Sequence, residues 1–296
     1  MLEKIPIQTI STNVTKKHSV VLGMARFDLL HPVVSGNKFF KLRFYIEQAI
    51  ATNKKGLITM GGYYSNHLIA AAYAAQQAGL KSRGVIRGEQ PKVLSPTLQD
   101  CHQLGMELIY SSRTEFDLFN SSTYCEKNPE FYFIPQGGFG PLGKIGAASM
   151  MEIDGIEEYE IILAVAGTGT MAAGLISRLL PHQSLEIISV LKGNHLLEEK
   201  ICSLLTPEEQ NGKKFIVHHQ YHEGGYARYT PALLQRMNQF YSETGIPTDF
   251  VYTGKLIHAF FTALDTNTNW HQKKVLLVHS GGLQGNRSLT QHELMF

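Results

Sequence analysis

The chain has 296 residues, 43% of them hydrophobic, and its 27 basic and 25 acidic side chains give a formal charge of +2. This length and composition allow a substantial core, in one large domain or two modest ones. The small net charge and the lack of a basic block argue against a nucleic-acid partner and favour a small-molecule ligand.

Targeting and redox signals are also weak. The first twenty residues contain no apolar signal core, and no stretch is long and apolar enough to cross a bilayer. The three cysteines, Cys101, Cys125 and Cys202, are widely spaced and form no C-x-x-C pair, which argues against a disulfide framework and a thiolate metal site. We therefore expect a cytoplasmic protein with reduced thiols and no membrane partner.

Short apolar runs of β type alternate with helical segments along most of the chain. The predicted strands are 56–60, 82–88, 106–111, 131–135, 161–167, 186–191, 214–219 and 274–280, and the predicted helices include 66–79, 94–105, 170–180 and 230–245. This alternation predicts an α/β fold with parallel sheets and helices on both faces. The glycine-rich segment 136–148 interrupts the pattern, so we expect a smaller domain at 48–147 and a larger one from 1–47 plus 148–296.

The segment GNKFFK, 36–41, precedes a helical run and carries an unusual lysine. Asn37 is a suitable cap for that helix, and Lys38 is followed directly by Phe39 and Phe40. On these residues alone, the pattern favours a surface lysine whose stem covers apolar neighbours over a reactive amine.

A second segment, TMGGYYSNHLIAAA at 59–72, leads from a strand end through two glycines into an alanine-rich helix. Ser65 and Asn66 are good capping residues, and a cap needs no further function. The same amides could equally bind a substrate carboxylate, with Asn66 available to a cofactor oxygen, so both interpretations stay open.

The most informative loop is AVAGTGTMAAG, 164–174, in which a buried strand turns through glycine and threonine into a helix of small residues. Unpaired amides and the helix dipole at such a start favour phosphate binding. The pattern also satisfies a relaxed dinucleotide fingerprint, but the next strand ends in lysine, glycine and asparagine rather than the acidic residue that holds a ribose. A single phosphate therefore fits better than a dinucleotide, and a merely tight turn is the remaining alternative.

Three later segments contain candidate polar groups. The tyrosines of GGYARY, 224–229, and VYTGK, 251–255, are of the isolated kind that more often packs half-buried than acts as an acid or base. VHSGGLQG, 278–285, is predicted to leave backbone donors facing an anion. HHQYH, 218–222, has histidines with opposite facings and no supporting carboxylate, so we expect no metal site.

Taken together, these residues resemble a known family. Lys38 in SGNKFFKL, the Ser65-Asn66-His67 segment, the loop 167–170 and Tyr252 in VYTGK are similar to pyridoxal-phosphate enzymes of the tryptophan synthase β fold, fold type II. The nearest members are 1-aminocyclopropane-1-carboxylate deaminase and D-cysteine desulfhydrase, and the similarity runs from about residue 20 to residue 285. The resemblance implies two α/β domains with pyridoxal 5′-phosphate in the cleft between them, in a homodimer.

The resemblance also implies roles for individual residues. Lys38 would form the internal aldimine, Asn66 would lie near the 3′ oxygen of the cofactor, and Ser65 with neighbouring amides and His67 would bind the substrate. Two active-site tyrosines of the family match Tyr226 and Tyr252. The phosphate would be held by Ala166, Gly167, Thr168, Gly169 and Thr170.

Two positions distinguish between the relatives. The deaminase has a glutamate where this chain has Thr253, and a hydroxyl supplies no negative charge to keep the ring nitrogen of the cofactor protonated. Opening a cyclopropane ring needs the stronger electron sink, whereas loss of a good leaving group from the β-carbon does not. His67 agrees, since the desulfhydrase has histidine there and the deaminase glutamine.

The resemblance therefore implies a lyase that converts D-cysteine, a small amino acid, to pyruvate, sulfide and ammonia. Deamination of 1-aminocyclopropane-1-carboxylate to 2-oxobutyrate is the alternative within the family. A dinucleotide-binding oxidoreductase and a non-catalytic binding protein are the alternatives outside it. FFK replaces the usual T-R-K after the lysine, and ARYT follows Tyr226 in place of G-L-P-N, so the substrate pocket differs from the standard one.

Overall fold

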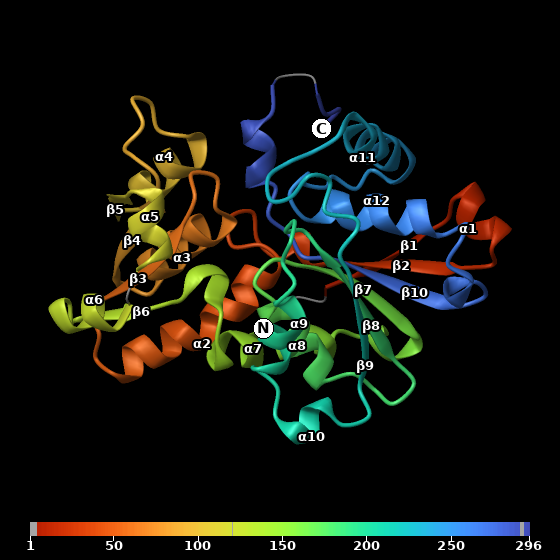
Figure 1. The fold of residues 1–296 in the computed structure, drawn as a ribbon, viewed down its shortest axis with the longest axis horizontal. Coiled ribbons are helices and arrows are strands. Elements are labelled where there is room, and N and C mark those ends of the chain that lie inside the picture. Colours follow the sequence, from red (N-terminus) through yellow and green to blue (C-terminus); the bar gives the residue numbers. More distant parts are fainter. Residues whose placement is uncertain (1–4, 120, 291–292) are drawn as a thin grey trace.

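Two mainly parallel sheets form the framework of the fold (Figure 1). The computed structural model describes residues 5–119, 121–290 and 293–296. The six-stranded sheet has the order β1 (Ile7–Ile10), β2 (Val21–Arg26), β10 (Lys274–His279), β7 (Ile161–Ala166), β8 (Ser184–Ser189) and β9 (Lys214–His218). The four-stranded sheet has the order β5 (Met106–Ser111), β4 (Lys81–Arg87), β3 (Gly56–Gly61) and β6 (Phe131–Phe133).

Helices connect the strands. They are α1 (Asn13–Lys17), α2 (Asn37–Ala51), α3 (Asn66–Gln77), α4 (Pro96–Gln103), α5 (Arg113–Asp117), α6 (Ser121–Lys127), α7 (Pro141–Ala148), α8 (Thr170–Ser177), α9 (Leu197–Cys202), α10 (Pro207–Gln210), α11 (Pro231–Thr244) and α12 (Thr253–Ala263). In the described ranges, none of these helices has the length and apolar character that crossing a bilayer requires.

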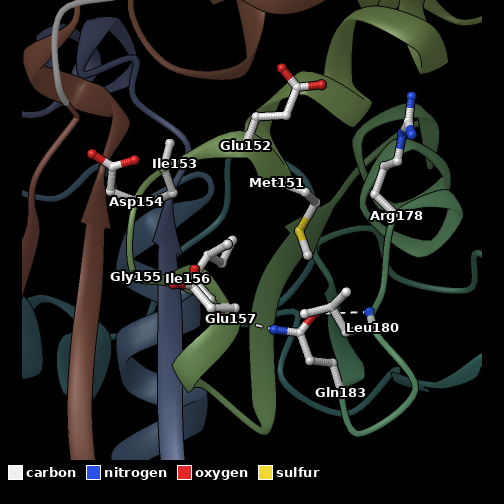
Figure 2. Close-up of a pocket in the computed structure, with 10 residues that line it drawn as sticks. All are labelled: Met151, Glu152, Ile153, Asp154, Gly155, Ile156, Glu157, Arg178, Leu180 and Gln183. Atoms are coloured by element: carbon white, nitrogen blue, oxygen red, sulfur yellow. Dashed lines mark hydrogen bonds between the residues drawn. The ribbon is translucent and has the colours of Figure 1, made fainter.

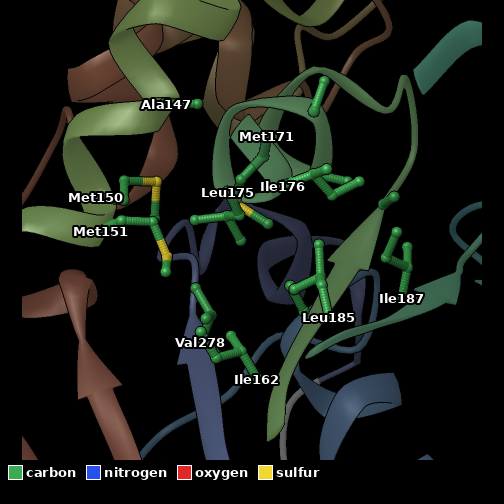
Figure 3. Close-up of a cluster of buried hydrophobic side chains, with 14 of the residues drawn as sticks. Ala147, Met150, Met151, Ile162, Met171, Leu175, Ile176, Leu185, Ile187 and Val278 are labelled. Atoms are coloured by element: carbon green, nitrogen blue, oxygen red, sulfur yellow. The ribbon is translucent and has the colours of Figure 1, made fainter. Parts of the chain in front are cut away.

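Strand β7 shows how the larger core is built. Its six residues are all buried, as expected for a parallel strand covered on both faces. Ile162, Ala164 and Ala166 pack with α7, α8 and α9, and Figure 3 shows part of this cluster. The other three residues of β7, Ile161, Leu163 and Val165, pack on the opposite face with α11 and α12, because successive strand side chains point to opposite sides.

The predicted α/β fold with parallel sheets is confirmed, and the eight predicted strands overlap β3 to β10. The prediction omits β1 and β2, and β1 pairs antiparallel with β2, so the larger sheet is not wholly parallel. Of the four residues in β1 only Ile10 is buried, which explains why its apolar pattern is weak.

The glycine-rich segment 136–148 does not simply interrupt the fold, because α7 occupies its second half. Pro141 stands in the first turn of α7, where its missing amide proton is not needed. A side chain on Gly146 would overlap the carbonyl of Phe40 in α2. The glycines therefore allow close packing of the helices.

The sequence predicts no helix at VYTGK, whereas α12 begins there at Thr253.

Helix α2 belongs to two cores. Phe40, near its start, is part of the cluster on the six-stranded sheet, whereas Leu42, Tyr45 and Ala49 pack with the four-stranded sheet. The first turn of α2 therefore lies where the two α/β units meet. The boundaries proposed for the smaller unit, 48–147, stay a prediction.

Candidate active site

The first turn of α2 places Lys38. Gly36 precedes the helix with φ of 61°, a left-handed conformation that favours glycine, and a Cβ there would overlap the carbonyl of Ser280. Gly36 and not Asn37 is therefore the N-cap, which corrects the predicted cap. Asn37 instead accepts a 2.7 Å hydrogen bond from Lys38 Nζ and approaches the sulfur of Met171 in α8 at 3.2 Å.

Lys38 is not an ordinary surface lysine, although its residues alone favour that interpretation. Its Nζ lies 5.9 Å from the centroid of the Tyr252 ring. Burial lowers the pKa of Lys38 from 10.5 to about 8, and the carboxylate of Asp249 opposes part of that shift. About a tenth of this amine is consequently neutral at pH 7, far more than of an ordinary lysine.

Lys41 is a second buried amine that the sequence prediction missed. Only 4% of it is exposed, and its Nζ donates a 3.2 Å hydrogen bond to the carbonyl of Gly137. Burial and the neighbouring Lys38 hold the pKa of Lys41 well below its usual value. Gly137 abuts Thr168, since a Cβ on Gly137 would lie 3.0 Å from the Thr168 methyl group. The available signal was its spacing of three from Lys38, which puts both amines on one helix face.

The glycine-threonine loop leaves several polar groups without a protein partner. Gly169, with φ of 88°, is the N-cap of α8. In the described part of the chain, none of the backbone amides of 168–172 donates to a protein acceptor, and the hydroxyls of Thr168 and Thr170 lie 3.3 Å apart. Unpaired amides and hydroxyls at a helix start suit a phosphate.

The segment after β3 also combines a cap with unpaired groups. Ser65 is the N-cap of α3, and its Oγ accepts from the amides of His67 and Leu68. Asn66 Nδ2 donates to the carbonyl of Gly282 at 3.0 Å, whereas its buried Oδ1 has no partner among the described residues. An unpaired buried acceptor of this kind is costly unless a ligand or water supplies a donor.

The loop 278–285 does not present the donors predicted for it. The amide of Gly281 donates to His279 Nδ1 at 3.3 Å, and the amide of Gly282 donates to Ser35 Oγ at 2.9 Å. Both donors are therefore used inside the protein. The prediction of an anion site at this loop is wrong, because neighbouring side chains satisfy its glycines.

His67 is buried in one tautomer. The hydroxyl of Thr59 donates to the carbonyl of Ile134 at 2.8 Å, so it must accept from His67 Nε2 at 2.7 Å. His67 Nδ1 is then a bare acceptor, and it has no partner within the described ranges. Burial, together with Lys38 and Lys41, holds the pKa of His67 well below its usual value, so the ring is neutral.

The two predicted tyrosines meet, with their ring centroids 6.2 Å apart and their planes at 68°. Tyr252 is half-buried, whereas 49% of Tyr226 is exposed. Burial raises the pKa of Tyr252 well above its usual value, and Tyr226 and Asp249 raise it further. Tyr252 therefore keeps its proton at neutral pH.

Asp249 is a buried carboxylate that sequence reasoning missed. It accepts from the amides of Val251, Tyr252 and Thr253 and, at 2.8 Å, from the Thr253 hydroxyl, while burial raises its pKa. Thr253 is fully buried, and its hydroxyl proton is already donated to Asp249. Toward any further partner, this hydroxyl can therefore act only as a hydrogen-bond acceptor. The sequence-based prediction considers only the uncharged hydroxyl of Thr253, and it does not take into account that Asp249 lies next to it.

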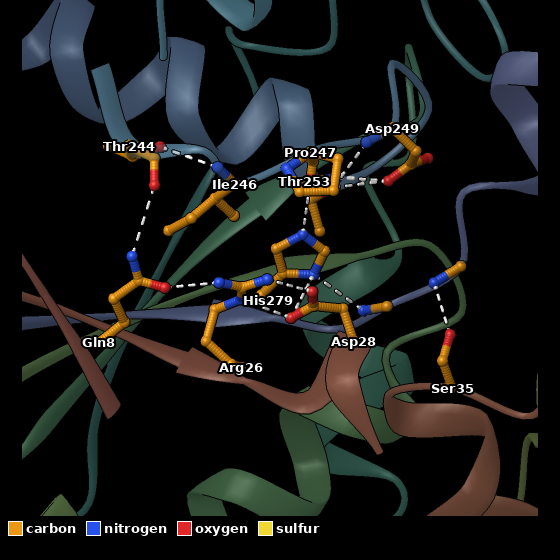
Figure 4. Close-up of polar contacts among 12 residues, drawn as sticks. Gln8, Arg26, Asp28, Ser35, Thr244, Ile246, Pro247, Asp249, Thr253 and His279 are labelled. Carbon is orange, nitrogen blue, oxygen red and sulfur yellow. Dashed lines mark hydrogen bonds and ion pairs between the residues drawn. The ribbon is translucent and has the colours of Figure 1, made fainter. Parts of the chain in front are cut away.

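A polar network holds the segment that precedes Asp249 in place (Figure 4). His279 Nε2 donates to the carbonyl of Pro247 at 2.8 Å, and Arg26 contacts Asp28 through two nitrogens at 2.9 and 2.7 Å. Asp28 Oδ1 lies 3.5 Å from His279 Nδ1, so the network joins β2, the end of β10 and the segment before α12. It thereby fixes the chain that carries Asp249.

Other polar features lie apart from these residues. His218 pairs with Glu186 at 2.7 Å and His219 with Glu198 at 2.8 Å, so both histidines have a carboxylate partner, contrary to the prediction. No group of three or more potential metal ligands occurs in the described part of the chain. A cavity of about 490 Å³ lined by Met151, Arg178 and their neighbours contains none of the predicted site residues (Figure 2).

The residues around Lys38 fit pyridoxal phosphate. Asn37 links Lys38 to α8, the Tyr252 ring lies against Gly167, and Lys41 contacts the loop beside Thr168. Asn66 contacts Gly282, and the loop of Gly282 in turn contacts Ser35 and Asn37, directly before Lys38. A partly neutral amine, a helix start with unpaired donors and the unpaired Oδ1 of Asn66 are thus joined by a short series of contacts. An aldehyde carrying a phosphate requires these groups together.

Comparisons with known proteins agree with this geometry. A family model described as pyridoxal-phosphate dependent enzyme matches residues 11–281. A Thermotoga maritima protein with the provisional name 1-aminocyclopropane-1-carboxylate deaminase is 29% identical, and the alignment covers 96% of this chain and 95% of that protein. The Arabidopsis thaliana protein named bifunctional D-cysteine desulfhydrase/1-aminocyclopropane-1-carboxylate deaminase, mitochondrial, is 26% identical over 89% of this chain and 73% of its own length.

Among solved structures, an ACC deaminase homologue superposes with a TM-score of 0.81 at 23% identity, covering 96% of this chain and 90% of that one. This likeness confirms the predicted fold type II architecture. The family match extends over most of the sequence, from before β2 into the loop after β10. The chain therefore belongs to the family of pyridoxal-phosphate-dependent enzymes.

Proposed function

We propose that this enzyme eliminates the β-substituent of a small amino acid and releases its nitrogen as ammonia, with D-cysteine as the leading substrate. D-cysteine and water would give pyruvate, hydrogen sulfide and ammonia. The observation that carries the proposal is the lowered pKa of Lys38 beside the unpaired amides of 168–172. The cofactor supplies an aldehyde that captures amines and a ring that withdraws electrons from the α-carbon.

The chain's own residues divide the remaining work. Ala166 and the loop 167–170 would hold the phosphate. The negative charge of a bound phosphate would raise the lowered pKa of Lys41, so that its ammonium would then balance that charge. The neutral amine of Lys38 is the group suited to accept the α-proton, because the raised pKa of Tyr252 makes that phenol a donor and not a base at neutral pH.

The substrate would be bound by the start of α3. The hydroxyl of Ser65 and nearby amides suit its carboxylate, and Asn66 Oδ1 can accept from a cofactor or substrate donor. The unprotonated Nδ1 of His67 can accept a hydrogen bond from a donor such as the thiol of the substrate. The glutamine that the deaminase has at this position would differ, because its amide nitrogen would donate hydrogen bonds to the substrate.

Deamination of 1-aminocyclopropane-1-carboxylate to 2-oxobutyrate is the second candidate. It is supported by the names of the relatives from Thermotoga maritima and Arabidopsis thaliana. The family match leaves the dinucleotide-binding oxidoreductase without support.

The test is a steady-state assay of the purified enzyme with D-cysteine, L-cysteine, D-serine and 1-aminocyclopropane-1-carboxylate. Sulfide with pyruvate from D-cysteine is the expected result, and 2-oxobutyrate would identify the second candidate. Lys38→Ala should abolish turnover, whereas Lys200→Met, at an exposed lysine of α9, should leave it unchanged. Turnover of none of the four compounds by cofactor-loaded protein would reject the proposal.

We further propose a cytoplasmic homodimer. The free state of all three cysteines is consistent with a reducing compartment. Leu29 and Phe39 are exposed apolar side chains, 58% and 37% exposed, that a partner subunit could cover. Sedimentation velocity would determine the oligomeric state.

A further inference from the structure

Lys255 is a fully buried lysine to which the proposed function assigns no role. It stands in the first turn of α12, and no part of its side chain is exposed. Its Nζ donates to the carbonyls of His222 and Gly225 at 2.7 and 2.6 Å. The carboxylates of Asp249 and Glu223 favour its charged form, while burial lowers its pKa to about 8.

The two carbonyls that Lys255 contacts organise consecutive turns. The carbonyl of His222 also accepts from the amide of Gly225 at 2.9 Å, and the carbonyl of Gly225 accepts from the amide of Arg228 at 3.1 Å. Tyr226 lies inside the second turn. One ammonium thus contacts both turns of the segment 222–228, which we call the tyrosine loop.

The backbone of the tyrosine loop needs such support. Glu223 and Ala227 have φ of 50° and 51°, and Gly224 and Gly225 have φ of 91° and 114°. Positive φ is disfavoured for residues with a side chain, and it persists only where surrounding contacts impose it. Glu223 adds a second attachment, since it accepts a 2.6 Å hydrogen bond from the hydroxyl of Thr230 at the start of α11.

We propose that Lys255 is a positioning residue that holds the tyrosine loop so that Tyr226 stands against Tyr252. The contacts continue from there to the reactive amine: Tyr226 lies edge-on to Tyr252, whose ring is 5.9 Å from Lys38 Nζ. The importance of this arrangement for turnover rests on the proposed function, whereas the attachment of the loop does not.

The attachment is tested on the cofactor-free protein. Trypsin can cut after the exposed Arg228 only where the loop opens. Lys255→Met, which keeps an unbranched apolar stem but lacks the ammonium that donates to the loop, should speed cleavage after Arg228 at least tenfold. Cleavage after other exposed basic residues such as Arg43 should stay within twofold. Lys200→Met is the matched control and should cleave like the unmodified protein.

Fragments ending at residue 228 are quantified by mass spectrometry. An unchanged rate after Arg228, or an equal rise at all sites, overturns the proposal, because the second pattern reports global unfolding. If Lys255→Met does not fold, Lys255→Gln takes its place, since its uncharged amide stands on a side chain one atom shorter and falls short of the two carbonyls that the ammonium reaches at 2.7 and 2.6 Å. The same local rise is expected.

A double-mutant cycle on active enzyme then tests the route through Tyr226. Lys255→Met and Tyr226→Phe should each lower kcat with little change in the affinity for pyridoxal phosphate. The double variant should be no slower than the slower single variant. Additive losses would show that Lys255 acts by another route. A protein inactive on all substrates defeats the proposed function, while the cleavage assay still decides whether Lys255 holds the loop.

Discussion

Lys38 should react with pyridoxal phosphate at neutral pH much faster than an ordinary lysine. Burial lowers its pKa from 10.5 to about 8. At pH 7 a pKa of about 8 leaves roughly 9% of the amine neutral, whereas an ordinary lysine is neutral to roughly 0.03%. Because the neutral amine is the nucleophile, the expected advantage is roughly 300-fold. The rate should rise about tenfold per pH unit below pH 8 and level off above it.

The rate is measured by mixing cofactor-free protein with pyridoxal phosphate and following absorbance across the pH range. Borohydride trapping and peptide mapping locate the modified residue at Lys38. The reagent titrates in the same range, so its reaction with Nα-acetyl-lysine is measured in parallel. After the known ionisation of that free amine is removed, the remaining pH dependence belongs to the reagent and is divided out of the Lys38 rate. Lys38→Ala shows what other lysines contribute.

Asp249→Asn sharpens the test. The charge of Asp249 raises the pKa of Lys38, so its removal should move the break in the profile below pH 8. A corrected rate that still climbs tenfold per unit above pH 9 would refute the reasoning, because it would mean that Lys38 ionises like a lysine in water.

Three further predictions concern binding and stability. Lys41→Met should weaken the affinity of cofactor-free protein for pyridoxal phosphate and for inorganic phosphate by about 10- to 100-fold in an equilibrium titration, because a charge-assisted contact is lost; a change below about twofold would contradict its placement. Gly146→Ala should lower the free energy of unfolding by about 3 kcal/mol in urea, because the new methyl group overlaps Phe40, whereas Gly62→Ala, with open space around it, should change it by less than about 0.5 kcal/mol. From pH 8 to 10, Lys255 is deprotonated in the folded protein but still protonated in the unfolded chain, so the free energy of unfolding should rise with pH. In urea titrations across this range, Lys255→Met should reduce that rise by up to about 1.4 kcal/mol per pH unit.

The parallel strands and the open helix start after β7 are predictable because their causes are local. A strand covered on both faces is a continuous apolar run, and a glycine-threonine turn before small residues marks an open helix start. Lys41 and Asp249 were not predictable in the same way, because their importance depends on burial and on partners far along the chain. The cap of α2 was misjudged because Gly36 is required by the approach of Ser280 and not by the helix itself.

The contacts of α2 attach the first turn of this helix, and with it Lys38, to the six-stranded unit. Asn37 approaches Met171 in the first turn of α8 and donates its amide to the carbonyl of Ser280, so the turn that carries Lys38 is attached to the six-stranded unit. The proposed phosphate site belongs to the same unit, because α8 follows β7. Ser65, in contrast, begins a helix that packs on the four-stranded sheet. Lys38 and the proposed phosphate site are thus fixed relative to each other by one core, while the proposed carboxylate site is supplied by the other.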